Sequence, residues 1–133
     1  MIYIAESVYA ECMEGGPIRL PDLKKAPWIT VLADDDALAL PVQFELDSGE
    51  KQTIALALKH RADMVIMDER IGRRVAEYFG LRITGTLGIL LKARVQGLIP
   101  SFHDAAMAMR KEGLYFNPAL VSRLATHVGE KNA

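Results

Sequence analysis

The sequence is poor in the features that mark secreted and membrane proteins. It holds one cysteine, Cys12, among 133 residues, which excludes an internal disulfide and fits a reducing cytoplasm. No apolar run approaches the ~20 residues of a membrane span, and the start lacks the basic region and long apolar core of a signal peptide. The net charge is only -1, so no excess of one sign draws the whole chain to nucleic acid or membrane. We therefore expect a cytoplasmic protein without membrane contact.

Several kinds of catalytic chemistry are also missing. No glycine cluster opens a helix directly after a buried strand, which excludes a dinucleotide-binding fingerprint. The three histidines are far apart in the sequence and lack zinc spacing, and the single cysteine has no evident histidine partner. The remaining candidates are carboxylates, which favour Mg²⁺ or Mn²⁺. Such ions activate water and hold a phosphodiester.

What is present is an ordinary globular composition, 50% hydrophobic and 25% charged, in a length that suits one domain over residues 1–133. Apolar runs and helical periodicities alternate along the chain, which indicates an α/β protein with a parallel sheet that finishes in two helices. The predicted strands are Ile2–Ile4, Trp28–Leu32, Met64–Met67 and Leu81–Thr84. The predicted helices are Glu6–Met13, a weak one over Ala37–Leu46, one opening at Ser48, then Glu69–Tyr78, Leu87–Val95, one from Ser101 through Arg110, and one after Asn117-Pro118.

The stretch Asp47–Ala93 places two acids where a site is expected. Ser48 is a suitable N-cap, and Glu50 falls in the first turn of its helix. The four apolar residues Met64–Met67 predict a short strand buried on both faces, and Asp68 ends it. A helix packed against the following strand runs roughly antiparallel to it, so the helix start and the strand end meet at one edge of the sheet. We expect Glu50 and Asp68 to be neighbours there, where open α/β sheets bind ligands.

Each of these acids also has a purely structural interpretation. Glu50 suits the helix dipole, worth about 0.3–1 kcal/mol, and Asp68 suits an N-cap of the helix at Glu69, worth about 1 kcal/mol. The acidic run Asp34-Asp35-Asp36 suits metal binding, or a solvated loop that caps the next helix.

Two further groups suit phosphate. Arg70, Arg73 and Arg74 follow Asp68 and would hold nucleic-acid phosphates, or form a solvated helix face. The helix start at Gly85-Thr86-Leu87 would receive a phosphate through its amides, or be a plain cap.

The order and spacing of three segments resemble a known family, that of PIN-like proteins called domain of unknown function 3368. The segments are Gly49-Glu50 with Ile54-Ala55-Leu56-Ala57, Ile66-Met67-Asp68-Glu69-Arg70 with Gly72-Arg73, and Gly85-Thr86-Leu87-Gly88-Ile89-Leu90-Leu91-Lys92-Ala93. The resemblance extends more weakly from about Ile4 to Glu130.

The resemblance implies a three-layer α/β/α fold with a short parallel sheet, and a Mg²⁺- or Mn²⁺-dependent ribonuclease, often the toxin of a toxin–antitoxin module. It implies that Glu11, Glu50 and Asp68 are catalytic metal ligands. RNA and an antitoxin-like protein are the partners it suggests.

The sequence departs from the family at its start. The family normally begins with a strand ending in Asp-Thr-Ser, whose aspartate is the first metal ligand, followed by about two helices. The present chain opens after them, at the strand Ile2–Ile4. We therefore expect an N-terminally truncated fold with a strand missing between Ile2–Ile4 and Met64–Met67. Exposed strand edges favour pairing with another chain, so we expect a homo-oligomer.

Two functions are compatible with these sequence features. One is a metal-dependent ribonuclease, and the other is a non-catalytic remnant that binds a partner protein or its own copy.

Overall fold

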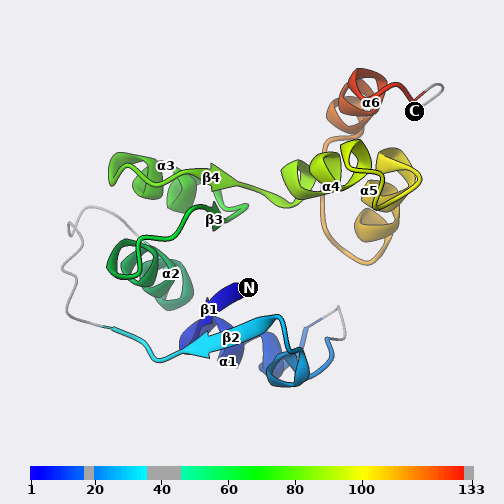
Figure 1. Cartoon of the computed structure of the whole chain (residues 1–133). Coiled ribbons are helices and arrows are strands. Elements are labelled where there is room, and N and C mark those ends of the chain that lie inside the picture. Colours follow the sequence, from blue (N-terminus) through cyan, green and yellow to red (C-terminus); the bar gives the residue numbers. More distant parts are fainter. Residues whose placement is uncertain (17–19, 36–45, 131–133) are drawn as a thin grey trace. The chain divides into compact units, whose positions relative to one another are not determined.

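In this computed structural model the described residues are 1–16, 20–35 and 46–130, and they form two compact units, Met1–Thr84 and Gly85–Ala133. The N-terminal unit alternates strands and helices, and the C-terminal unit is helical (Figure 1). The architecture is thus α/β with short parallel sheets, as the alternation predicted. The weak helix expected over Ala37–Leu46 lies outside the described residues except for Leu46. No helix of the described residues is long and apolar enough to cross a membrane.

The N-terminal unit contains two parallel strand pairs. β1 (Ile2–Ala5) pairs with β2 (Ile29–Leu32), and β3 (Val65–Ile66) pairs with β4 (Ile83–Thr84). In the described part of the chain the two pairs share no strand-to-strand pairing, so they form separate two-stranded sheets. The sequence predicted one parallel sheet, whereas the described strands form two separate parallel pairs.

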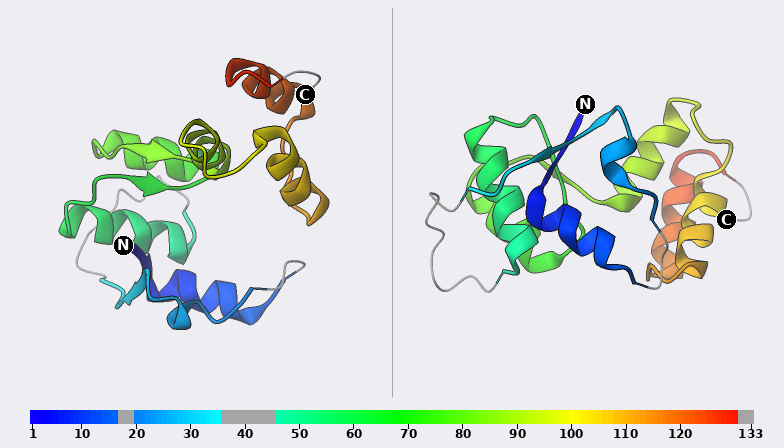
Figure 2. Two further views of the ribbon diagram at one scale, coloured as in Figure 1. Left: turned by 45° about the vertical axis from the view of Figure 1, so that its right-hand side comes forward. Right: turned by 90° about the horizontal axis from the view of Figure 1, so that it is seen from below.

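The helices of this unit are α1 (Glu6–Glu14), α2 (Ser48–Lys59) and α3 (Arg70–Tyr78), with a short 3-10 turn, η1 (Leu23–Lys25). Helix α2 contacts both β1 and β3, and Figures 1 and 2 show it between the two strand pairs. Its inner side is apolar, and α2, β3 and α3 bury one hydrophobic core. The members of this core are Leu46, Ile54, Ala57, Val65, Met67, Val75 and Ala76.

Local chemistry moves several predicted boundaries. Asp47, not Ser48, caps α2: its Oδ1 accepts from the Glu50 amide at 2.8 Å, and Glu50 Oε1 accepts from the Asp47 amide at 3.3 Å. This reciprocal capping box needs an acceptor three residues before the glutamate, which only Asp47 supplies. Similarly, Glu69 rather than Asp68 caps α3, through the amide of Ile71.

The prediction that Met64–Met67 is buried on both faces was wrong. Val65 and Met67 are buried, whereas Met64 is 42% and Ile66 46% exposed. Only Val65 and Met67 of this run pack in the core of α2 and α3, and Ile66 on the other face lines a cleft at the sheet edge. The run therefore alternates, as half-buried strands do.

The C-terminal unit consists of α4 (Thr86–Val95), α5 (Phe102–Lys111) and α6 (Pro118–His127). Asn117 caps α6 with Pro118 at its first position, as predicted. A second core, separate from that of the N-terminal unit, holds Phe102, Ala106, Val121 and Ala125, with Leu87, Leu90 and Leu91 of α4 packed against it.

Candidate functional site

A cleft of about 380 Å³ lies in the N-terminal unit, where the start of α2 meets the end of β3. Among the described lining residues five are acids and none is a lysine or arginine. The acids are Glu11, Asp47, Glu50, Asp68 and Glu69, and the others are Val8, Gly49, Thr53, Ile66, Met67 and Ile71. The three acids proposed from the sequence, Glu11, Glu50 and Asp68, thus line one cleft. A cleft lined by several acids favours the binding of a cation.

Glu11 reaches this cleft from α1, which begins directly after β1 and packs on α2. Its carboxylate lies against the backbone of Gly49: a Cβ at that glycine would be 2.7 Å from Glu11 Oε1. Any side chain at position 49 would therefore push Glu11 aside. The glycine lets the two helices bring Glu11 to the residue next to Glu50.

Glu50 is held from two sides. Its Oε1 accepts the Asp47 amide, and its Oε2 lies over Gly72, where a Cβ would be 2.5 Å away. Oε2 is buried and has no hydrogen-bond partner among the described residues. A buried oxygen without a donor costs about 1–3 kcal/mol. Such an atom is one that a bound cation would satisfy.

The electrostatics of the cleft act on the same carboxyl group. Burial raises the pKa of Glu50, and the negative charges of Asp47 and Glu69 raise it further, although the Asp47 amide opposes the shift. The described residues of the cleft therefore carry more negative than positive charge. A divalent ion would relieve this repulsion.

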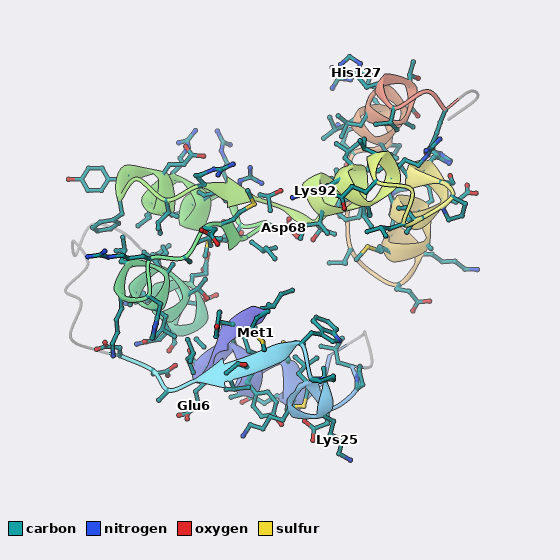
Figure 3. The ribbon with its side chains drawn as sticks, viewed as in Figure 1. Met1, Glu6, Lys25, Asp68, Lys92 and His127 are labelled. Atoms are coloured by element: carbon teal, nitrogen blue, oxygen red, sulfur yellow. The ribbon has the colours of Figure 1, made fainter. Side chains whose placement is uncertain are left out.

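Asp68 follows β3 and lies at the edge of the strand pair (Figure 3). It is exposed to solvent, as is Glu69. Glu50 and Asp68 line the same cleft, as expected if the start of α2 lies beside the end of the next strand.

The donor chemistry fits Mg²⁺ or Mn²⁺, which take carboxylate oxygens. The convergence is incomplete, however. Among residues 1–16, 20–35 and 46–130, no three His, Cys, Asp or Glu side chains come together closely enough to hold one metal ion.

Other candidates from the sequence lie outside the cleft. Arg70, Arg73 and Arg74 are on α3 and are not lining residues; Arg70 and Arg74 are exposed. At the start of α4, Gly85 occupies the N-cap position and makes no side-chain cap.

The acidic run at Asp34 has structural roles where it is described. Asp34 Oδ1 accepts from the amide and hydroxyl of Ser7 at 3.1 and 3.2 Å, at the start of α1. Asp35 forms an ion pair with Lys59 at 3.1 Å, and its amide donates to Gln52. Asp34 thus contacts the start of α1, and Asp35 contacts α2. Asp36 lies outside the described residues.

Sequence reasoning gave no role to Asp47, Glu69, Gly49 and Gly72. The spacing Asp47-x-x-Glu50 is a capping-box signal that could have identified the first. The two glycines carry no such signal, because their close approach to Glu11 and Glu50 depends on how α1, α2 and α3 pack.

Comparison with known protein families identifies the family of the chain. The sequence model of domain of unknown function 3368, described as a PIN domain, matches residues 1–130. Neither a curated protein nor a solved structure matches the chain.

Proposed function

The chain belongs to the PIN domain family, and on that premise we propose that it is a Mg²⁺- or Mn²⁺-dependent ribonuclease, of the kind that serves as the toxin of a toxin–antitoxin module. PIN domains generally use divalent metal ions. The observation that supports the proposal is that Glu11, Glu50 and Asp68 line one cleft, with no lysine or arginine among its described lining residues. A cytoplasmic location, which suits a single free cysteine, is part of this proposal.

In this account Glu11, Glu50 and Asp68 hold the ion. The Oε2 of Glu50 supports this assignment, because it is buried and has no hydrogen-bond partner in the part of the chain that the structure describes. The described lining residues include no histidine or cysteine. When bound, a divalent ion lowers the pKa of a coordinated water and polarises a phosphoryl oxygen. Glu69, also in the lining, adds negative charge that attracts the cation.

The RNA would be positioned by cations beside the cleft. Arg70, Arg73 and Arg74 occupy the first turns of α3, directly after Glu69. Exposed guanidinium groups bind phosphate oxygens in a planar, two-pronged geometry. We assign the two exposed ones, Arg70 and Arg74, to the RNA backbone.

The test is cleavage of a fluorescently labelled single-stranded RNA with Mn²⁺ present. The wild-type chain should cleave it, chelation should stop the reaction, and Asp68→Asn should remove most activity. Glu77→Gln is a matched control, because Glu77 is an exposed acid of α3 outside the cleft lining; it should cleave like wild type. Absence of cleavage by the wild-type chain, or full activity in Asp68→Asn, would contradict the proposal.

A second candidate function has its own observation. β1 and β3 each pair with one strand only in the described residues, and apolar side chains on and beside them are exposed: Tyr3 60%, Met64 42% and Ile66 46%. Free strand edges with apolar side chains favour pairing with another chain. We propose as the alternative a non-catalytic module that binds its own copy or an antitoxin-like protein.

Light scattering across a hundredfold range of concentration tests this alternative. Self-association predicts a mass that rises with concentration and falls in Tyr3→Lys, since a charge on an edge strand blocks pairing. A constant monomer mass would contradict self-association.

A further inference from the structure

We propose that the C-terminal unit binds one nucleotide of single-stranded RNA in a cleft beside the end of α5. The base would stack on Tyr115, and its phosphate would contact Arg110. The choice of RNA as the ligand rests on the proposed ribonuclease function. The existence of the binding site rests on the cleft itself.

The cleft has about 390 Å³ and lies between α5 and the chain that leads to α6. Its lining residues are Met107, Arg110, Lys111, Gly113, Leu114 and Tyr115. This volume is at the small end of ligand sites, which suits one nucleotide better than a folded partner.

Tyr115 is an aromatic side chain that the core does not use. It is 75% exposed, although its neighbour Phe116 packs against the core of this unit. Phe116 thereby anchors the backbone that follows Tyr115, while the tyrosine ring stays open to solvent. An exposed ring on a fixed backbone is a stacking platform for a base of any sequence.

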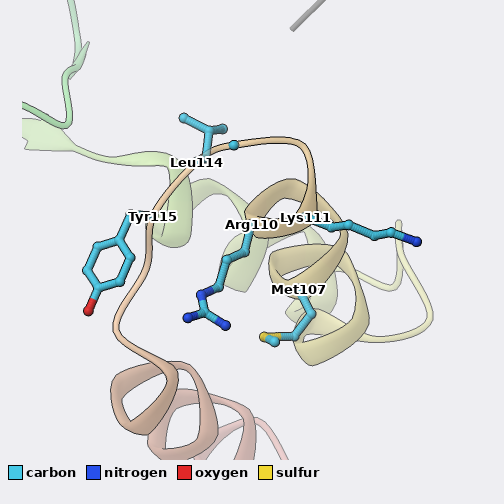
Figure 4. Close-up of a pocket in the computed structure, with 6 residues that line it drawn as sticks. Met107, Arg110, Lys111, Leu114 and Tyr115 are labelled. Atoms are coloured by element: carbon cyan, nitrogen blue, oxygen red, sulfur yellow. The ribbon is translucent and has the colours of Figure 1, made fainter. Parts of the chain in front are cut away.

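Arg110 supplies the charge next to that ring. Its guanidinium carbon lies 5.8 Å from the centroid of Tyr115, within the range of a cation–π contact. Figure 4 shows the Arg110 side chain reaching toward the space between Tyr115 and Met107, whereas Lys111 extends away from it. Arg110 is half-buried, so less conformational freedom is lost when it binds a phosphate than for a fully exposed arginine.

The charge of the lining selects an anion. Arg110 and Lys111 are both cationic, and the lining of the cleft in the described part of the chain includes no aspartate or glutamate. Glu112 follows them in the sequence but is the exposed C-cap of α5 and not a lining residue. An anionic ligand with a flat aromatic part matches a nucleotide. Recognition of single-stranded RNA by stacking and guanidinium contacts has this chemistry.

Fluorescence anisotropy with labelled oligouridylate in EDTA tests the proposal, because without divalent ions binding is measured apart from cleavage. Tyr115→Ala should weaken binding about tenfold, within the range expected for loss of one stacking contact. Tyr115→Phe should bind like wild type, since stacking needs the ring and not the hydroxyl. Arg110→Gln should weaken binding and reduce its salt dependence. Trp28→Ala is the matched control, because Trp28 is a 57% exposed aromatic residue of the N-terminal unit that is not a lining residue of either cleft; it should bind normally.

Binding by Tyr115→Ala equal to that of wild type would overturn this inference, as would absence of binding by wild type. Displacement of the RNA by oligoglutamate as effective as by unlabelled RNA would also overturn it, and would indicate an acidic peptide ligand. The outcome is separable from the proposed function. Loss of Mn²⁺-dependent cleavage in Asp68→Asn tests the acidic cleft, and that variant should still bind RNA in EDTA.

Discussion

Replacing Glu50 by glutamine should stabilise the metal-free protein. Glutamine keeps an oxygen that can accept the Asp47 amide, so the capping box survives. It removes the negative charge that stands beside Asp47 and Glu69 and that burial already disfavours. An unsatisfied buried polar atom costs about 1–3 kcal/mol. The glutamine amide would occupy the place of Glu50 Oε2, and the cleft is partly open to solvent. We therefore expect the free energy of unfolding to rise by only about 0.5–1 kcal/mol.

The assay is urea unfolding in EDTA at pH 7, followed by fluorescence. Trp28 is the only tryptophan and lies in the N-terminal unit, so its signal reports on the unit that holds the cleft. With a denaturant slope of about 1–3 kcal/mol/M, the midpoint of Glu50→Gln should rise by a few tenths of a molar.

The pH dependence has a definite sign. The pKa of Glu50 is raised in the folded state, so its favourable contribution is fully present below the unfolded value of about 4.3 and is lost as pH rises through the folded pKa. Wild type and Glu50→Gln should therefore have similar stability near pH 4 and diverge toward pH 7, with the variant higher.

Mn²⁺ should reverse this order. A ligand present at a hundred times its dissociation constant stabilises the folded state by about 2.7 kcal/mol, and wild type should gain more than Glu50→Gln.

If the variant is less stable than wild type in EDTA by more than about 1 kcal/mol, Glu50 serves the helix alone, as its dipole role would require. An equal gain from Mn²⁺ in both proteins would likewise refute the reasoning.

Three further predictions follow from other contacts. Gly72→Ala should weaken Mn²⁺ binding at least tenfold by calorimetry, because its Cβ would lie 2.5 Å from Glu50 Oε2, although alanine is better in a helix by about 1 kcal/mol; unchanged affinity would contradict this. Glu130→Gln should cost the C-terminal unit about 1–2 kcal/mol, because Glu130 accepts from Arg94 at 3.0 Å and from two amides at the start of α5. Despite partial burial, these donors lower the pKa of Glu130, so its contribution to stability should be present above about pH 4.3 and disappear as pH falls through the lowered pKa. Hydrogen exchange of α5 amides measures the effect of the substitution and of pH, and unchanged protection in the variant would contradict this role of Glu130. Asp47→Ala should lower the free energy of unfolding by about 1 kcal/mol through loss of the capping box, measured by the same urea assay, and an unaltered midpoint would contradict that role.

Much of the fold could be predicted because its signals are local. Helical spacing and turn residues identified α1, α3, α5 and α6 to within about one residue at their ends, and Asn117-Pro118 identified a cap outright. The errors at Ser48 and Asp68 were also local, since adjacent acids and hydroxyls compete for one cap position and tertiary packing decides between them.

The division of the sheet was harder to derive. Strands of two to four residues have too few side chains to specify which neighbour they pair with. The exposure of Ile66 was missed for a similar reason, because a short apolar run looks the same in the sequence whether one face or both faces of the strand are buried.

The candidate site was predictable in part. A helix start and the following strand end meet at one sheet edge by topology alone, which placed Glu50 near Asp68. Glu11 is distant in sequence and entered only through resemblance to the family. The contact of its carboxylate with Gly49 depends on how closely α1 and α2 pack, which no sequence period encodes.

Anomalous scattering from crystals of the protein soaked in Mn²⁺ tests the proposed metal site most directly. We expect one strong anomalous peak in the cleft, with oxygens of Glu11, Glu50 and Asp68 as its nearest protein atoms. No peak there at millimolar Mn²⁺, or a peak only elsewhere on the molecule, would contradict a metal-dependent site built from these acids.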